Sequence, residues 1–176
     1  VLTLQLRNEL LSLYDISTQH DARVNAVRQM QDGSNYLTDQ ARMFTVAGSK
    51  SFLDNYFVEE NETRRIDLAA EKLQEYSEDS GSLAYITTAL RFSRIQKKTE
   101  YYAMRLMLET TEIDPAEWPQ ELQNLTLSDE DLALSEKEQL RAAQQLVRNA
   151  SYLGNKDAIA SALAAYQEAL DSDTRA

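Results

Sequence analysis

Five arginines, spread over three predicted helices, are the residues of this sequence best suited to bind a ligand. A guanidinium group matches a carboxylate or another planar anion through two parallel hydrogen bonds. The three helices are expected to face one another, and several tyrosines fall at comparable heights along them. The residues are Arg42, Arg64, Arg65, Arg91 and Arg94, with Tyr36, Tyr56 and Tyr85. Their grouping predicts a cleft that binds a small anion.

The alternative interpretation is that these arginines form ordinary ion pairs at the surface. Four acidic residues lie close to them in the sequence: Glu59, Glu60, Glu62 and Asp67. Exposed pairs of this kind are common on solvated helix faces and contribute little to stability. The sequence leaves both interpretations open.

Other kinds of chemistry lack the residues that they need. The single histidine, His20, has no carboxylate at metal-ligand spacing, and there is no Glu-x-x-His pair of the kind that di-iron bundles use. Cysteine is absent, and so are a glycine-rich phosphate loop, a Gly-x-Ser-x-Gly elbow and a kinase signature. We therefore expect no metal, no cofactor and no enzymatic activity. We interpret His20 as a polar layer in a helical seam, with a pH-responsive role as the alternative.

The composition is typical of one all-α domain. Among 176 residues there are four glycines and two prolines, so the residues that punctuate strands and turns are scarce. The formal charge is −11, and no cluster of Lys and Arg is large enough to follow a phosphate backbone. These features predict a helical domain without a nucleic-acid partner.

Apolar residues recurring at steps of three and four predict four long helices and one irregular crossover. The helices are expected at about 2–47, 51–77, 83–110 and 136–171, with the crossover at 113–134. Gly48 is expected to end the first helix in a left-handed conformation, and two prolines mark the crossover. Kinks are expected at Asp32-Gly33-Ser34 and at Gly154-Asn155. Ser135 and Glu138 are spaced as a capping box for the last helix.

An even number of antiparallel helices places both chain ends at the same end of an elongated four-helix bundle. The sequence starts in helical phase without an initiator Met, and no apolar run approaches the ~20 residues of a membrane span. We interpret the chain as a piece of a longer protein, whose first and last helices continue in parallel into two membrane spans.

Two segments resemble a known class of bacterial domains. They are LTDQARMFTVAGSKSFLDNYF, over 37–57, and AAQQLVRNASYLGNKDAIASAL, over 142–163. The first resembles the helix-glycine-helix signature of helical extracytoplasmic sensor domains, the four-helix-bundle and CHASE-like input domains of chemoreceptors, sensor histidine kinases and diguanylate cyclases. Arg42, Phe44, Gly48, Leu53 and Tyr56 fit that signature, whereas Ser49 stands where an acidic residue is common.

The resemblance implies a homodimeric input domain between two membrane helices, on the periplasmic or outer side of a bacterial cell membrane. Its first and last helices would relay a cue to a cytoplasmic output module such as a histidine kinase or a diguanylate cyclase. The ligand would be a small anion, an amino-acid-like molecule or a periplasmic protein. The rival interpretation is a soluble helical adaptor or structural domain that binds partner helices through an exposed seam.

Overall fold

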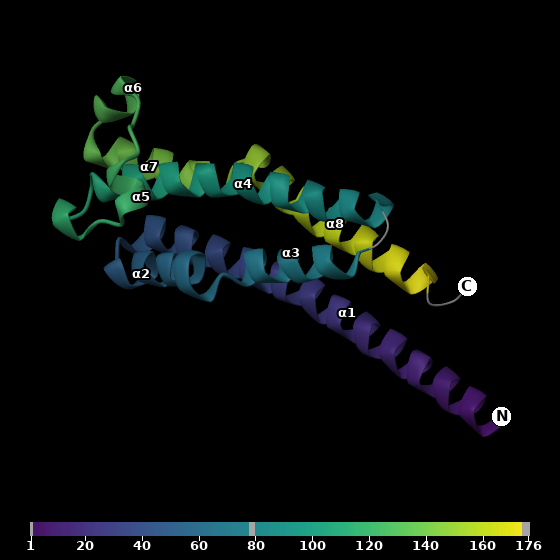
Figure 1. Cartoon of the computed structure of the whole chain (residues 1–176). Coiled ribbons are helices and arrows are strands. Elements are labelled where there is room, and N and C mark those ends of the chain that lie inside the picture. The colour runs from purple at the N-terminus through teal and green to yellow at the C-terminus, as the bar shows by residue number, and fades with distance from the viewer. Residues whose placement is uncertain (1, 78–79, 174–176) are drawn as a thin grey trace.

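The computed structural model describes residues 2–77 and 80–173, and within them it is all-α and contains no strand (Figure 1). The main helices are α1 (Leu2–Ala47), α2 (Lys50–Val58), α3 (Arg65–Tyr76), α4 (Ser80–Leu108), α7 (Glu136–Leu146) and α8 (Ala150–Asp173). The all-helical class predicted from composition is confirmed. Within the same residues, no helix combines the length and the apolar composition that a membrane span requires.

The first helix has the predicted bounds, and α1 is continuous from Leu2 to Ala47 through Asp32-Gly33-Ser34, where we expected a kink. Gly33 lies where α3 packs against this helix. A Cβ atom at this position would lie 3.0 Å from the Cβ of Arg65 and 3.1 Å from Cγ1 of Ile66. The start of α3 therefore packs closely on α1 at this glycine, and a side chain here would displace its neighbours by a few tenths of an ångström.

Gly48 ends α1 as predicted. Its φ is +62°, and its amide donates to the Phe44 carbonyl at 2.8 Å. A Cβ atom here would also lie 3.2 Å from the terminal methyl group of Met107 on α4. The left-handed backbone and this close contact both favour glycine, and the turn returns the chain along α1 as α2 and α3.

The predicted single helix over 51–77 is wrong in one respect, because it is divided near its middle. A π-helix, η1 (Glu59–Thr63), follows α2, and Arg64 then adopts the left-handed conformation, with φ of 50° and ψ of 39°, before α3 begins. The Arg64 amide donates to the Glu59 carbonyl at 2.7 Å, which closes the wide turn. Wide turns and left-handed non-glycine residues are both found preferentially at functional sites.

The crossover between α4 and α7 contains three short helical turns, η2 (Pro115–Glu117), α5 (Gln120–Gln123) and α6 (Asp129–Leu132). Its leucines attach it to the long helices, since Leu122 and Leu127 are both buried in the apolar core. The indole nitrogen of Trp118 donates to the Ile113 carbonyl at 3.0 Å, and Arg105 lies over the Trp118 ring.

The single helix predicted over 136–171 is also divided into two helices, α7 and α8. The division lies before Gly154-Asn155, where we expected only a kink. The chain leaves helical geometry at Val147–Asn149, between α7 and α8, whereas Gly154 lies inside α8. The Asn149 side chain accepts a hydrogen bond from the Tyr152 amide at 2.9 Å and caps the start of α8. The predicted capping box of Ser135 and Glu138 is present at the start of α7.

Two apolar clusters form most of the core. One joins α1, α3, α4 and α8 through residues such as Met30, Leu73, Ile86 and Leu163. The other joins α1, α2, α4, the crossover and α7 through residues such as Phe44, Leu53 and Met104. Between these clusters the facing side chains are polar, and the candidate site lies there.

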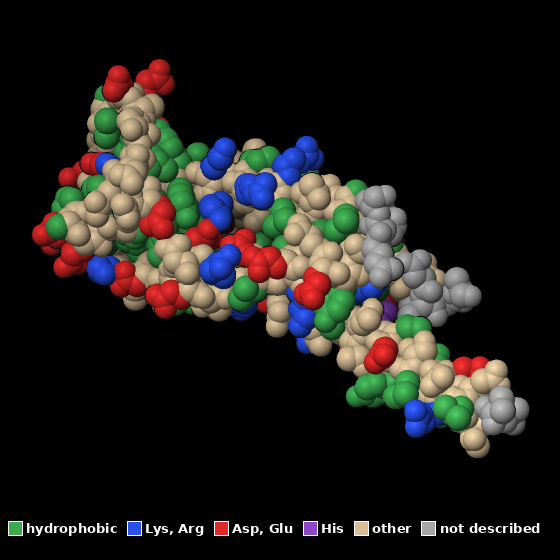
Figure 2. Space-filling model, in the orientation of Figure 1, with side chains coloured by type: hydrophobic (Ala, Val, Ile, Leu, Met, Phe, Trp, Pro, Cys, Tyr) green, Lys and Arg blue, Asp and Glu red, His purple; other side chains and the backbone are tan. Residues whose placement is uncertain are grey.

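The beginning of α1 extends past the other helices (Figure 1). Seven large apolar side chains on it are more than half exposed; they are Leu4, Leu6, Leu10, Leu11, Leu13, Tyr14 and Ile16. Figure 2 shows hydrophobic side chains on this projecting part of the molecule. We refer to 4–16 as the N-terminal apolar stretch.

Candidate functional site

A pocket of about 60 Å³ lies between η1, the start of α3 and the middle of α4. Three of the five predicted arginines line it, Arg64, Arg65 and Arg94, together with Lys97. Glu59, Glu60 and Asp67 supply the negative charges, and Leu37, Ile66, Leu90 and Ser93 complete the wall. We call this cavity the arginine pocket. The left-handed backbone at Arg64 and the contact at Gly33 place its two consecutive arginines.

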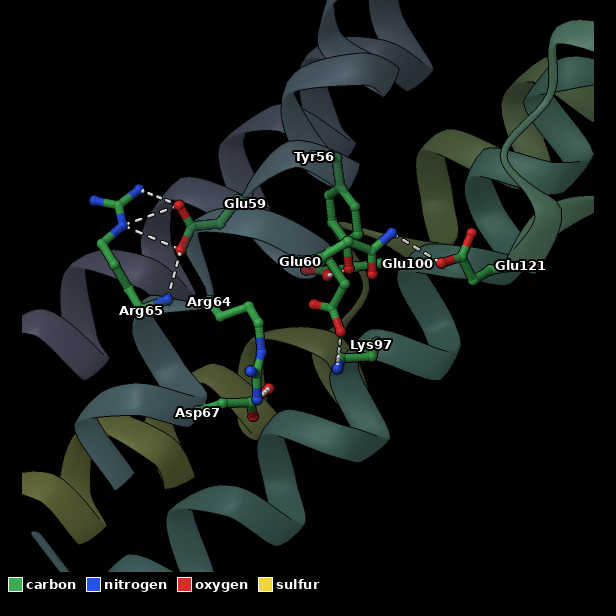
Figure 3. Close-up of polar contacts among 10 residues, drawn as sticks. Tyr56, Glu59, Glu60, Arg64, Arg65, Asp67, Lys97, Glu100 and Glu121 are labelled. Atoms are coloured by element: carbon green, nitrogen blue, oxygen red, sulfur yellow. Dashed lines mark hydrogen bonds and ion pairs between the residues drawn. The ribbon is translucent and has the colours of Figure 1, made fainter. Parts of the chain in front are cut away.

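Arg65 forms the best-defined ion pair of the pocket. Its Nη2 lies 2.8 Å from Oε2 of Glu59, its Nε lies 3.0 Å from the same oxygen, and its backbone amide donates to Oε1 at 3.2 Å (Figure 3). The guanidinium also stacks over the Tyr36 ring at 4.9 Å. The hydrogen bond to Glu59 raises the pKa of Arg65, against the effect of burial. This arginine therefore already has a partner for its charge.

The other cations of the pocket differ in how they are paired. Arg64 is exposed and lies 3.4 Å from Asp67 and 3.7 Å from Glu71. Lys97 reaches back to Glu60, and Figure 3 shows this pair between α4 and η1. Arg94 is exposed and has no ion pair, hydrogen bond or ring contact with any residue that the structure describes. It is the cation of the pocket whose hydrogen-bond donors are available.

The remaining predicted site residues lie outside the arginine pocket. Arg42 donates from Nε to the Val147 carbonyl at 3.0 Å and lies 5.3 Å from the centre of the Tyr152 ring. Arg91 is exposed on α4 and stacks on the neighbouring Phe92. The structure thus brings together Arg64, Arg65 and Arg94, whereas Arg42 and Arg91 contact other parts of the bundle.

The predicted tyrosines also have different surroundings. Tyr36 lies beneath Arg65, at the edge of the pocket, and Tyr85 is partly exposed on α4. Tyr56 is fully buried, and its hydroxyl points away from solvent toward Glu100 (Figure 3). The surface ion pairs of the alternative interpretation are partly present, as Arg65–Glu59 and Arg64–Asp67, while Glu60 pairs with Lys97 instead.

A second polar group, behind the pocket, was not recognised in the sequence. Glu100 on α4 is 2% exposed and contacts no cation at ion-pair distance among the described residues. Its Oε2 accepts from the Tyr56 hydroxyl at 2.7 Å, and its Oε1 accepts from the Tyr152 hydroxyl at 2.5 Å. The Gln96 amide and the Thr38 hydroxyl donate to Oε1 at 3.2 and 3.4 Å. We call these five residues the Glu100 cluster.

Burial controls the protonation of this cluster. Loss of solvation raises the pKa of Glu100, although hydrogen bonds from Tyr152, Tyr56 and Gln96 oppose the change. Burial and the nearby Glu100 carboxylate raise the pKa of Tyr56 well above its ordinary value and also raise that of Tyr152. Both phenols therefore remain hydrogen-bond donors at any physiological pH.

The sequence did contain a signal for this cluster. Ile86, Ala89, Gln96, Glu100 and Ala103 are all buried, and they follow one another on α4 at helical spacing. A search for apolar residues alone does not identify Gln96 and Glu100, because both are polar. Polar residues in phase with a core stripe are the pattern that identifies such a cluster.

The Glu100 cluster and the arginine pocket are neighbours. A small cavity of about 10 Å³ lies between them and shares Leu37, Ile66, Ser93 and Lys97 with the pocket, while Gln96 and Glu100 line its inner side. The Gln96 side chain is 3% exposed, and its Oε1 has no hydrogen-bond partner. A buried acceptor without a partner costs about 1–3 kcal/mol unless something bonds to it.

No set of three or more His, Asp or Glu side chains in residues 2–77 and 80–173 is arranged to hold a metal ion. His20 Nε2 lies 3.3 Å from Oδ1 of Asp171, between α1 and α8. This polar contact links α1 to α8.

Comparisons of the chain with protein-family models, with curated proteins and with solved structures give no match.

Proposed function

We propose that this chain is the input domain of a transmembrane signal receptor, and that it senses a ligand and relays the cue along α1 and α8. The observation that carries the proposal is the continuity of α1. This one helix contributes Leu37 to the arginine pocket and Thr38 to the Glu100 cluster, and it continues without a break to the exposed N-terminal apolar stretch. From Leu37 to Leu10 it spans about 40 Å at 1.5 Å per residue.

Such a helix is suited to relay a change at the pocket. A ligand that binds one arrangement of α1, α3 and α4 more tightly than another shifts the population toward that arrangement. A differential affinity of a few kcal/mol changes populations tenfold or more. Because α1 is unbroken, a shift or tilt at Leu37 is carried to its other end.

The arrangement of the long helices supports a bundle with both ends on one side. In Figure 1 the first turn of α1 and the last turn of α8 lie toward the same side of the view. The His20 and Asp171 contact places the end of α8 beside α1, and α1 extends past that point. The proposal continues these two helices into membrane spans, with this domain on the outer side of a bacterial membrane and the output module inside. The location and the output module rest on the sequence resemblance.

The N-terminal apolar stretch supports a homodimer. Its exposed leucines and Tyr14 occupy roughly half of the helix circumference, whereas Ser12, Asp15 and other polar residues occupy the rest. A second copy of α1 would bury this surface, and the burial of each large apolar side chain contributes about 1.5–3 kcal/mol.

Cysteine cross-linking in the full-length receptor tests this proposal. The sequence has no native cysteine, so Leu10→Cys introduces a single thiol on the apolar side of α1. We expect rapid formation of a disulfide-linked dimer in membranes. The matched control is Ser12→Cys, which lies on the opposite side of the same turn and should cross-link slowly. Equal rates for the two variants would contradict the dimer, and a gene without apolar spans on both sides of this segment would contradict the receptor.

A soluble adaptor is the second candidate, and the same exposed stretch favours it. In that function the partner on α1 is a helix from another protein, and no membrane spans flank the domain. Sedimentation of the purified chain distinguishes the two. A monomer that binds an amphipathic helix with one-to-one stoichiometry supports the adaptor, and a concentration-dependent dimer supports the receptor.

A further inference from the structure

Two side chains near the arginine pocket have hydrogen-bonding capacity that the folded chain leaves unused. Arg94 provides guanidinium donors at the outer side of the pocket, since no described residue bonds to it. Gln96 lines the small inner cavity, and its buried Oε1 is an acceptor without a partner. The two cavities share Leu37, Ile66, Ser93 and Lys97, so one small molecule in contact with these residues lies next to both groups.

The charges of the pocket limit the charge of such a molecule. Arg64, Arg65, Arg94 and Lys97 are opposed by Glu59, Glu60 and Asp67, so four positive charges face three negative ones. Figure 2 shows basic and acidic side chains next to one another on the surface near the middle of the molecule. One excess positive charge matches a single carboxylate group, whereas a dianion would also be repelled by Glu60 and Asp67.

The volume limits its size. The pocket measures about 60 Å³ and the inner cavity about 10 Å³. A cavity of ~10–15 Å³ on this measure holds one water, so the pocket itself accommodates roughly four to six non-hydrogen atoms. This is the size of a carboxylate with one or two carbons and one further polar group.

We propose that the arginine pocket binds a small carboxylic acid that carries a hydroxyl or an ammonium group on the carbon next to the carboxylate. The carboxylate accepts from Arg94 at the outer side, and the hydroxyl or ammonium donates to Oε1 of Gln96 at the inner side. Leu37, on α1, lines both cavities, so binding acts directly on the helix that leads to the N-terminal apolar stretch. This inference deepens the proposed function, and rests on it, by naming the ligand class of the same site.

The test uses calorimetry on the whole chain, with acetate, glycolate, glycine and inorganic phosphate as probes. Glycolate or glycine is expected to bind at least about tenfold more tightly than acetate, because only these two can donate to Gln96. Phosphate is expected to bind no more tightly than acetate. No binding by any probe at about 10 mM, or equal binding of acetate, glycolate and glycine, overturns the proposal. Phosphate as the tightest ligand also overturns it.

Two variants assign the contacts. Arg94→Ala is expected to weaken glycolate or glycine binding about tenfold or more, since a charge-assisted hydrogen bond is lost. Its matched control is Arg91→Ala, on the same helix and equally exposed but outside the pocket, and this variant should bind like the parent chain. Equal losses in the two variants contradict the assignment. Both arginines are exposed, so circular dichroism should show unchanged folding.

Gln96→Met, of similar length, is expected to remove the preference for glycolate over acetate while acetate still binds. If this variant does not fold, the Arg94→Ala series and the order of the four probes decide the question. Binding to the purified chain is measured separately from cross-linking in membranes. A negative result in calorimetry therefore contradicts only the ligand class, and a negative result in cross-linking contradicts only the dimeric receptor.

Discussion

Glu59 and Glu100 are two buried glutamates that the fold stabilises in different ways. Their exposed fractions are almost equal, 3% and 2%. Glu59 lies in η1 and pairs with Arg65, whose own side chain is 33% exposed, so water still solvates part of that cation. Glu100 lies deep between α1, α4 and α8, and hydroxyl and amide groups provide its hydrogen bonds.

The difference shows where the molecule can change. Ion pairs at the rim of the arginine pocket can exchange partners with an incoming anion, because the cation of each pair is at least partly exposed. The Glu100 cluster has no exposed member, and each of its contacts depends on the positions of α1, α2, α4 and α8. We therefore expect the cluster to fix the geometry of the bundle and the pocket to respond to ligands.

Removal of the Glu100 carboxylate should give the largest effect on stability. Glu100→Ala takes away the shared acceptor of two buried tyrosine hydroxyls and leaves a cavity. The free energy of unfolding in urea should fall by about 3 kcal/mol or more. Glu75→Ala, at an exposed position on α3, is the control and should change it by less than about 0.5 kcal/mol. A loss below about 1 kcal/mol for Glu100→Ala would mean that the cluster does not fix the bundle.

Removal of Arg65, the ion-pair partner of Glu59, should lower the stability of the fold by a smaller amount. Arg65→Ala leaves a buried carboxylate without its ion-pair partner, and we expect a loss of about 2 kcal/mol because water can replace part of the half-exposed guanidinium. Arg64→Ala is the control, since its pairs with Asp67 and Glu71 are exposed and contribute about 0–1 kcal/mol. Thermal unfolding of both variants measures the difference, and equal losses would contradict the distinct roles of these consecutive arginines.

The contact between α1 and α3 beside the pocket can be tested with two glycines in helices. Gly33→Ala places a methyl group 3.0 Å from the Cβ of Arg65, so α3 must move, at a cost of about 1–2 kcal/mol. Gly154→Ala meets no atom within 4 Å and should instead stabilise α8 by about 0.5–1 kcal/mol. Opposite signs in chemical denaturation are the expected result, and a stabilising Gly33→Ala would contradict the close packing of the two helices.

The smallest effect expected is the pH dependence that Glu100 adds to stability. Burial raises its pKa in the folded state, so the folded chain binds more protons than the unfolded chain at pH values above the ordinary pKa of about 4.5. Its contribution to stability is present below that value and is lost as the pH rises through the folded-state pKa. The free energy of unfolding of the parent chain minus that of Glu100→Gln should therefore decrease with rising pH over this window. A difference that increases with pH would contradict the assignment.

The sequence predicted most of the helices because their apolar stripes are long and regular. The bounds of α1 and the left-handed turn at Gly48 were predicted correctly, since a glycine after a periodic run is a strong signal. The break at Arg64 was missed because an arginine carries no intrinsic preference for a left-handed backbone. Tertiary contacts impose that conformation, through the packing of α3 on Gly33.

The candidate site was predictable only in part. Residue type identified Arg64, Arg65 and Arg94 as candidates, but the wide turn of η1 that precedes Arg64 and Arg65 was not predicted. Glu100 and Gln96 were missed because polar residues in a core stripe were taken to be outside it. The close packing at Gly33 was missed for a related reason, since the sequence does not reveal that another helix approaches a glycine.

The contact at Gly33 also restricts how α1 can move. The missing side chain leaves a gap that faces α3 in one rotational setting only, and Asp32 and Ser34 on either side both have a Cβ atom. If α1 turned about its own axis by one residue, a carbon atom would enter that gap and push α3 away. We therefore expect α1 to tilt or slide together with α3 as one rigid unit, and not to rotate about its own axis independently of α3.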